Sequence, residues 1–376
     1  MSYLRPAPPP KSALGRYRLL SPTASVRVSP LCLGTMNFGD AWKDWMGECD
    51  QSQSEKMLDY FYDQGGNFVD TANGYQGEQS EQWIGEWMMK RGNRDQIVLA
   101  TKYTACFRRG HDDETLVNFA GNGAKSLHTS INASLRKLQT DYIDLLYVHW
   151  WEFSTSIPEL MQSLNKLVST GKVLYLGISD TPAWVVTKAN QYARDHGLAQ
   201  FSVYQGRWSA AHRDLERDIV HMCRDEDMAI APWGSLGGGN FKTEEQRKAS
   251  TGRKIPPNET EINISEVLER IAIRKNTLIT SVAQAYVTHK APFVFPIVGG
   301  RSVDHLKANI EALSLKLTDE DMQEIDNVAK LDLGFPLNML WGDKVPDHPG
   351  KVFMLFQAGT YDHVPLAKPI APAHQG

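Results

Sequence analysis

Four polar side chains of different chemistry follow short apolar runs in the first half of the sequence. Asp70 ends the run "NFVD", Lys102 lies in "LATKY", His149 ends "DLLYVH", and Tyr75 follows in "FVDTANGYQGEQSE". Short apolar runs bounded by polar residues are typical of buried strands. If these strands are parallel neighbours, an acid, a phenol, an amine and an imidazole emerge at one edge of the sheet.

This set of groups suits the transfer of hydride to a carbonyl carbon. Negative charge then grows on the carbonyl oxygen, which needs a proton donor. A free tyrosine is a weak acid with a pKa of ~10, and a cationic lysine nearby is expected to lower that pKa. A carboxylate keeps the lysine charged and fixed, and a histidine can orient the carbonyl oxygen.

Each of these residues alone has a simpler interpretation. A lone lysine at a strand end is usually a solvated rim residue, and a histidine before two tryptophans is usually packed in the interior. Asp70, followed by Thr71, could cap the next segment. The four residues together, each at the expected strand end in the expected order, are much harder to obtain by chance.

Strand and helix signals alternate along the chain. The candidate strands are Leu31–Thr35, Phe68–Thr71, Ile97–Tyr103, Ile143–His149, Val173–Ser179, Phe201–Gln205, Ala229–Gly234 and Phe293–Val298. Stretches with helical spacing lie between them, among them Ser54–Gln64, Ser80–Arg91, Lys125–Leu138, Ile157–Thr170, Trp184–His196 and Leu215–Arg224. This alternation predicts a parallel sheet of the α/β class, and eight units suggest a single (β/α)8 TIM barrel.

Three segments fall outside a minimal barrel. Residues 1–30 form an N-terminal extension, expected to be a short hairpin that closes the barrel bottom. Gly237–Asn263 is a polar insertion after strand seven, and residues 331–376 form a Pro-containing tail without helical period. Long loops in a compact domain are usually functional or disordered, and the last two could cover an active site. We expect one domain over residues 1–376, with a core of about 28–330.

The composition is that of an ordinary globular protein, with 41% hydrophobic and 22% charged residues. A net charge of −4 gives no electrostatic reason to expect nucleic acid or a membrane surface as a partner. No apolar run is long enough for a signal peptide or a membrane span. The cysteines are far apart without a CxxC pair, which indicates neither a disulfide framework nor a zinc site. We therefore expect a cytoplasmic protein without a metal.

Seven segments together resemble the aldo-keto reductase superfamily: "GTMNFG", "NFVDTANGYQGEQSEQWIGEW", "LATKY", "DYIDLLYVHWW", "GKVLYLGISDTPAW", "IAPWGSLGGG" and "FPIVGGRSVDHLKANIEAL". The likeness covers nearly the whole chain and is closest to the fungal-type aryl-alcohol dehydrogenase group, which includes norsolorinic-acid-reductase-like enzymes. It implies that Asp70, Tyr75, Lys102 and His149 are a catalytic tetrad with Tyr75 as proton donor. It also implies NADPH-dependent, reversible reduction of aromatic aldehydes or ketones.

The cofactor site has its own sequence signal. No GxGxxG follows any strand, so a Rossmann site is not indicated. The segment "GGRSVDHLKAN" after strand eight is a better phosphate candidate, since its glycines permit close approach and it opens a helix whose N-terminus attracts anions. Arg301, His305 and Lys307 add positive charge. The alternative is an ordinary loop before a solvated basic helix.

By resemblance, the residues expected at NADP(H) run from the nicotinamide to the adenosine 2′-phosphate. They are Thr35, Met36, Asp70, Ser179, Gln205, Trp233, Ser235, Leu236, Gly238, Lys242, Gly299, Arg301, His305 and Asn309. Ser179 and Gln205 would hold the carboxamide, and Trp233 would pack on the ring. Two departures are present, because many family members carry Asn where this chain has Asp180, and Glu where it has Ala308.

The substrate is less readable from the sequence. Trp42 and Trp150 are the candidate substrate contacts, on loops expected above the tetrad. Aromatic rings suit a flat aromatic substrate by stacking; alternatively, these rings only cover the barrel mouth. The oligomeric state and the physiological carbonyl stay open.

The sequence is also compatible with two other functions and disfavours a third. The first is a ketone reductase of a polyketide pathway, of the norsolorinic acid type. The second is a cofactor-binding regulatory subunit with little turnover, as in the potassium-channel β subunits of the same superfamily. A metal-dependent barrel hydrolase is disfavoured, since no HxH pair ends the first strand and no cluster of acidic strand ends occurs.

Overall fold

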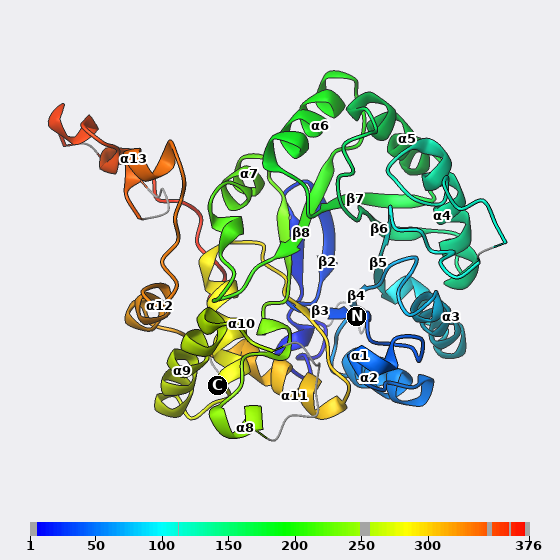
Figure 1. Ribbon diagram of the computed structural model, residues 1–376, viewed down its shortest axis with the longest axis horizontal. Helices are drawn as coiled ribbons and strands as arrows, with labels where there is room; N and C mark the ends of the chain where they lie inside the picture. The colour runs from blue at the N-terminus through cyan, green and yellow to red at the C-terminus, as the bar shows by residue number, and fades with distance from the viewer. Residues whose placement is uncertain (1–5, 112, 249–255, 344–347, 361, 373–376) are drawn as a thin grey trace.

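The computed structural model describes residues 6–111, 113–248, 256–343, 348–360 and 362–372. Eight parallel strands form one sheet in the order β10-β3-β4-β5-β6-β7-β8-β9, and helices surround it (Figure 1). The strands are β3 (Cys32–Gly34), β4 (Phe68–Asp70), β5 (Val98–Tyr103), β6 (Ile143–Val148), β7 (Val173–Ser179), β8 (Phe201–Arg207), β9 (Ala229–Trp233) and β10 (Ile297–Val298). The predicted (β/α)8 TIM barrel is confirmed.

The sheet closes between its first and last strands through an irregular segment. A parallel bridge joins Ile230 of β9 to Val294, just before β10. The expected strand Phe293–Val298 is correct in place but too long, because only Ile297–Val298 is regular. Phe293 has a φ of 54°, which interrupts an extended strand. The backbone of Ile230 still exchanges hydrogen bonds with Phe293 and Phe295, so the barrel remains closed.

The outer helices have clear start signals. The helices of the barrel are α2 (Gln51–Asp63), α3 (Gln79–Arg91), α4 (Ala124–Lys137), α5 (Ile157–Ser169), α6 (Ala183–Asp195), α7 (Ile219–Asp225), α9 (Glu259–Arg274), α10 (Ile279–Lys290), α11 (Val303–Glu311) and α12 (Asp319–Asp326). Ser156 caps α5, and Asn258 with Glu261 forms a capping box at α9. The expected helix Leu215–Arg224 is broken, since Asp218 has a non-helical φ of −141° before α7.

An antiparallel hairpin precedes the barrel, as expected from the sequence. Its strands are β1 (Arg18–Ser21) and β2 (Ala24–Val28). Leu20 and Val28 are fully buried against barrel residues such as Phe68. The Asn67 side chain, just before β4, bonds the backbone of the segment that leaves β2. The hairpin therefore closes the amino end of the barrel and leaves the carboxyl end open for chemistry.

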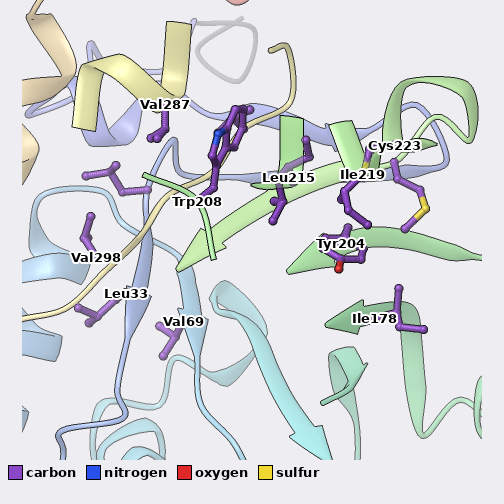
Figure 2. Close-up of a cluster of buried hydrophobic side chains, with 14 of the residues drawn as sticks. Leu33, Val69, Ile178, Tyr204, Trp208, Leu215, Ile219, Cys223, Val287 and Val298 are labelled. Carbon is purple, nitrogen blue, oxygen red and sulfur yellow. The ribbon is translucent and has the colours of Figure 1, made fainter. Parts of the chain in front are cut away.

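The main apolar core lies between the strands and the helices. Figure 2 shows side chains of the strands, such as Leu33, Val69 and Ile178, in one cluster with Leu215 and Ile219 of the helical layer. These side chains are almost or fully buried. Since a buried aliphatic side chain contributes roughly 1.5–3 kcal/mol, this layer holds the strand ends rigidly.

The insertion and the tail contain more helix than expected. Within Gly237–Asn263, the structure has η5 (Gly237–Gly239) and α8 (Glu244–Lys248), and the last residues begin α9, while 249–255 lie outside the described residues. The tail forms a short helix, α13 (Leu337–Trp341), where no helical period was expected. Figure 1 shows α13 outside the ring of helices, so this helix does not cover the barrel mouth.

Candidate active site

The carboxyl ends of β4 and β5 join three of the four residues expected to be catalytic. The Nζ atom of Lys102 donates to Oδ1 of Asp70 at 2.5 Å and to the carbonyl of Thr71 at 2.7 Å. It also lies 3.3 Å from the hydroxyl of Tyr75. Lys102 is fully buried, and a buried cation needs such partners. The structure therefore places an ammonium ion between a carboxylate and a phenol.

The second carboxylate oxygen of Asp70 accepts a hydrogen bond from a residue outside the expected tetrad. Gln205, at the carboxyl half of β8, donates its side-chain amide to Oδ2 of Asp70 at 2.9 Å. Both carboxylate oxygens of Asp70 are thus hydrogen-bonded. Gln205 was expected at the nicotinamide carboxamide, but in this structure its amide nitrogen is used by Asp70.

His149 lies on the other side of Tyr75, directly after β6. The two rings meet edge to face with their centroids 5.9 Å apart. The backbone N–H of His149 donates to the Tyr103 carbonyl at 3.1 Å, which fixes the main chain here. Its Nδ1 atom is buried and has no hydrogen-bond partner among the described residues. The four expected catalytic residues therefore lie around one point of the barrel mouth.

The protonation states of these groups follow from burial and from one another. Burial raises the pKa of Tyr75 above 10, and the opposing charge of Lys102 does not outweigh it. The lowering effect expected of Lys102 is therefore present, but burial outweighs it. Burial lowers the pKa of Lys102, but Asp70 and Tyr75 reverse this, and the pKa is raised overall. Burial and Lys102 hold the pKa of His149 well below 6.5. Near neutral pH the phenol is protonated, the amine charged and the imidazole neutral.

Two tryptophans flank this group of residues. The ring of Trp42 lies 6.2 Å from that of Tyr75, edge to face, and the ring of Trp150 lies 4.8 Å from that of His149. Trp150 is 37% exposed, so part of its ring is available for contact. Both tryptophans expected at the substrate thus lie beside the phenol and the imidazole.

Sequence reasoning missed the residues that hold the tryptophans in place. Gln76 is fully buried and its side chain accepts from the backbone N–H of Trp42 at 2.8 Å. Asn122 is also fully buried and donates to the carbonyl of Trp150 at 3.0 Å and to Thr104 at 2.9 Å. The position of Gln76 beside Tyr75 was a usable signal, whereas Asn122 lies in a loop with no pattern around it.

The loops after β9 and β10 carry the features expected of a dinucleotide site. Ser235 is buried, and its hydroxyl has no partner among the described residues. The glycines that follow, Gly237 and Gly238, have positive φ values of 73° and 61°, which glycine adopts without strain. After β10, Ser302 caps α11 by accepting from the N–H of His305 at 3.3 Å. An unpartnered hydroxyl, an open backbone and a helix N-terminus fit phosphate groups.

Arg301 of this segment reaches toward the loop after β3. Its guanidinium packs against Gly47, where an added Cβ atom would collide with it. Asn37, in the same loop, donates to the backbone carbonyl of Gly300. The loops after β3 and β10 are therefore joined at this point, and Arg301 lies at their junction.

Other residues expected at the cofactor have structural partners. The hydroxyl of Thr35 is fully buried and donates to the Asp70 carbonyl at 2.9 Å, so this hydroxyl already has a partner within the protein. Asn309 is 5% exposed, and its backbone carbonyl accepts from Gln284. Met36, Leu236 and Lys242 are half-buried, and Gly299 is exposed at the end of β10.

Asp180 and Trp233 form a contact that the sequence did not predict. The indole N–H of Trp233, at the end of β9, donates to both carboxylate oxygens of Asp180 at 3.3 Å. The hydroxyl of Ser179 donates to Oδ2 of Asp180, also at 3.3 Å. Ser179 was expected at the carboxamide, and its hydroxyl is directed to this carboxylate instead.

A buried lysine held by a carboxylate beside a tyrosine, at the carboxyl ends of barrel strands, defines an oxidoreductase site rather than a hydrolase site. The model of the aldo/keto reductase family matches residues 30–330, and the chain belongs to this family. The resemblance found in the sequence is thereby confirmed.

Several relatives are similar over nearly their whole length. Norsolorinic acid reductase B of Dothistroma septosporum is 55% identical over 96% of this chain and 95% of its own. Norsolorinic acid reductase A of Aspergillus parasiticus is 59% identical over 89% of this chain and 86% of its own. The aryl-alcohol dehydrogenase (NADP+) of Phanerodontia chrysosporium is 48% identical over 99% and 100%. Within the described residues, no helix is both long and apolar enough to cross a membrane.

Proposed function

We propose that this enzyme reduces aromatic aldehydes or ketones with NADPH, and oxidises the corresponding aryl alcohols with NADP+. The observation that carries the proposal is the contact of the Tyr75 hydroxyl with the Lys102–Asp70 pair, with Trp42 and His149 against the same ring. The names of the relatives, norsolorinic acid reductase and NADP+-dependent aryl-alcohol dehydrogenase, point to the same chemistry.

The protein's own residues supply the proton and orient the carbonyl. When bound, NADPH supplies the hydride. Tyr75 donates its proton to the carbonyl oxygen, and the charge of Lys102 stabilises the phenolate that remains. Asp70, held by Gln205, keeps Lys102 in place. Neutral His149 can donate a hydrogen bond to the same oxygen without competing as an acid.

The order of the strands in the barrel supports one direction for the bound cofactor. The loops after β9 and β10 are neighbours and contain Ser235, Gly238, Gly299 and Arg301. Ser235 and Gly238 would hold the pyrophosphate of the dinucleotide, and Trp233, at the end of β9, would pack on its ring. Its nicotinamide would then lie beside Ser179 and Gln205, at the ends of β7 and β8. The residues after β10, among them His305 and Asn309, would then contact the adenosine end of the cofactor.

The substrate would enter from the side of Trp42 and Trp150. These rings flank Tyr75 and His149, so an aryl group could stack on them while its carbonyl faces the phenol. A polyketide ketone of the norsolorinic acid type is the second candidate within this class, favoured by relatives of that name. Because the tetrad is joined by contacts, we favour turnover over a purely regulatory, cofactor-binding role.

Location and domain organisation are part of the same proposal. The four cysteines, Cys32, Cys49, Cys106 and Cys223, are all free thiols, which suits a reducing cytoplasm. We propose a single domain with its core over residues 28–330 and a tail over 331–376.

The test is the variant Tyr75→Phe, which keeps the ring and removes only the hydroxyl. Since general acid catalysis is worth ~10²- to 10⁴-fold, NADPH-dependent reduction of a benzaldehyde should fall by that factor. The affinity for NADPH, measured by fluorescence titration, should stay within about twofold of the wild type. Tyr60→Phe, on the outer helix α2, is the matched control. Wild-type turnover by Tyr75→Phe would refute the proposed proton donor.

A further inference from the structure

Asp180 places a second carboxylate at the barrel mouth, separate from Asp70. It follows β7 directly, and its backbone N–H donates to the Gln205 carbonyl at 3.0 Å. Its φ is 42°, a left-handed conformation that aspartate and asparagine tolerate better than most residues. The residue is held in this conformation at the edge of the proposed nicotinamide position, where its negative charge would act on the nicotinamide ring.

The neighbours of Asp180 donate hydrogen bonds to its carboxylate. Trp233 Nε1 lies 3.3 Å from both oxygens, and Ser179 Oγ lies 3.3 Å from Oδ2. An ionised carboxylate is an acceptor only, and all of these contacts are donated to it. Burial raises the pKa of Asp180 above 3.8, whereas the Trp233 and Ser179 hydrogen bonds, Lys102 and Arg207 act in the opposite direction.

The charges that face Asp180 come from three strands. Lys102 on β5 is already balanced by Asp70 on β4 at 2.5 Å. Arg207, the last residue of β8, pairs in register with Trp233 of β9 and lies on the exposed rim. Asp180, itself exposed, therefore adds a negative charge that Arg207 and the already paired Lys102 offset only in part, and water screens the charges at this rim.

The two forms of the cofactor differ in the charge of the nicotinamide ring. NADPH would supply the hydride to the carbonyl carbon and be left as NADP+, whose nicotinamide ring is positive, while Tyr75 would donate its proton to the carbonyl oxygen. A fixed carboxylate beside the ring stabilises the positive form and leaves the neutral form almost unaffected. An asparagine in the same place would keep the hydrogen bond to Trp233 without this preference.

We infer that Asp180 makes the enzyme bind NADP+ more tightly, relative to NADPH, than an asparagine at this position would. The inference rests on the proposed placement of the nicotinamide beside β7 and β8. Stabilising the positive ring also lowers the barrier to hydride departure, because the charge develops in the transition state. Asp180 is thus a determinant of the balance between the oxidised and reduced cofactor on the enzyme.

The experiment compares the dissociation constants of NADP+ and NADPH by fluorescence titration, in the wild type and three variants. Asp180→Asn should raise the ratio of the NADP+ constant to the NADPH constant by about 10-fold, which equals about 1.4 kcal/mol. Arg207→Gln should lower the same ratio, because it removes the opposing cation. Asp141→Asn, an exposed carboxylate before β6 at the opposite end of the barrel, should leave it unchanged.

The ratio separates a role of charge from a structural role. If Asp180→Asn leaves the ratio unchanged, or weakens both forms equally, Asp180 only supports Trp233 and the inference is overturned. Failure of the proposed function gives a different pattern: the wild type would bind neither form, or Tyr75→Phe would keep its turnover. Since binding is measured without substrate, the outcome does not depend on the identity of the carbonyl compound.

Discussion

Gln205 donates its side-chain amide to Asp70 across the barrel, over a sequence separation of 135 residues. The two residues lie on β8 and β4, which are four strands apart in the sheet order. With this bond, both oxygens of the Asp70 carboxylate have a hydrogen-bond partner, since the other oxygen accepts from Lys102 at 2.5 Å. This hydrogen bond therefore links β4, which ends at Asp70, directly to β8 on the opposite side of the barrel.

Gln205→Leu should slow carbonyl reduction more than it weakens cofactor binding. The variant leaves one oxygen of a buried carboxylate without a partner, at a cost of about 1–3 kcal/mol, and frees Asp70 to shift with Lys102. We expect kcat to fall by about 10-fold or more, measured with a benzaldehyde under saturating NADPH. Gln162→Leu, on the exposed face of α5, is the control. An unchanged kcat with a weaker NADPH affinity would instead support the carboxamide role expected from the sequence.

Lys102→Met should raise the apparent pKa that governs alcohol oxidation. Oxidation requires the Tyr75 phenolate, whose rate contribution rises with pH toward its pKa. Burial already raises this pKa, and Lys102 is the main group that opposes the rise. Without the cation, the pH–rate profile should move to higher pH and the rate at pH 9 should fall by at least ~10-fold. A profile that keeps its position would mean that Lys102 does not tune the pKa of Tyr75.

Asn122→Ala should weaken selection of aromatic over aliphatic aldehydes. Asn122 fixes the backbone of Trp150 and the side chain of Thr104, which in turn accepts from the N–H of His149 at 3.3 Å. Its loss releases the aromatic wall without removing any group of the tetrad. The ratio of kcat/KM for benzaldehyde to that for butanal should fall by about 5- to 20-fold. Asn132→Ala, at a half-buried position of α4, serves as control, and an unaltered ratio would contradict the positioning role.

Arg301→Ala should weaken NADPH binding by ~10- to 100-fold and NADH binding much less. A charge-assisted hydrogen bond to the 2′-phosphate contributes roughly 1.5–3 kcal/mol. Since Arg301 also packs against Gly47, the variant tests two roles at once. Fluorescence titration of both cofactors separates them, with Lys188→Ala, exposed on α6, as the control. Equal losses of affinity for NADPH and NADH would mean that Arg301 supports the loop after β3 and does not bind the 2′-phosphate.

Glu216→Ala should lower the free energy of unfolding by up to about 3–5 kcal/mol, because it removes the nearer carboxylate partner of the buried Arg213, which is left with Asp326 at 3.2 Å. Glu216 is 2% exposed and accepts from Arg213 at 2.7 Å and 3.0 Å and from Trp208 at 3.1 Å. Glu244→Ala removes an exposed pair with Lys248 and should change stability by less than about 1 kcal/mol. Urea denaturation followed by circular dichroism measures both, and equal effects would refute the special role of this buried pair.

The sequence was sufficient for the barrel and for the residues that meet at its carboxyl end. Strands buried on both faces are continuous apolar runs, so β5, β6 and β7 were visible without any neighbour. Asp70, Lys102 and His149 end such runs, and parallel strands carry their last residues to the same edge. An apolar run with a polar residue at its end is a local property of the chain that recurs in successive strands. The expectation of a closed barrel follows from the number of such strands.

Contacts across the barrel depended on the tertiary structure. Gln205 is bound to Asp70, Ser179 and Trp233 are bound to Asp180, and Thr35 is enclosed between β3 and β4. None of these partners is close in sequence except Ser179 and Asp180, so no spacing rule could assign them. The net pKa of Tyr75 also depended on burial, which a sequence does not state. Types and order of residues determine which groups reach the mouth of the barrel, whereas distance and desolvation, set by packing, determine which of them bind each other.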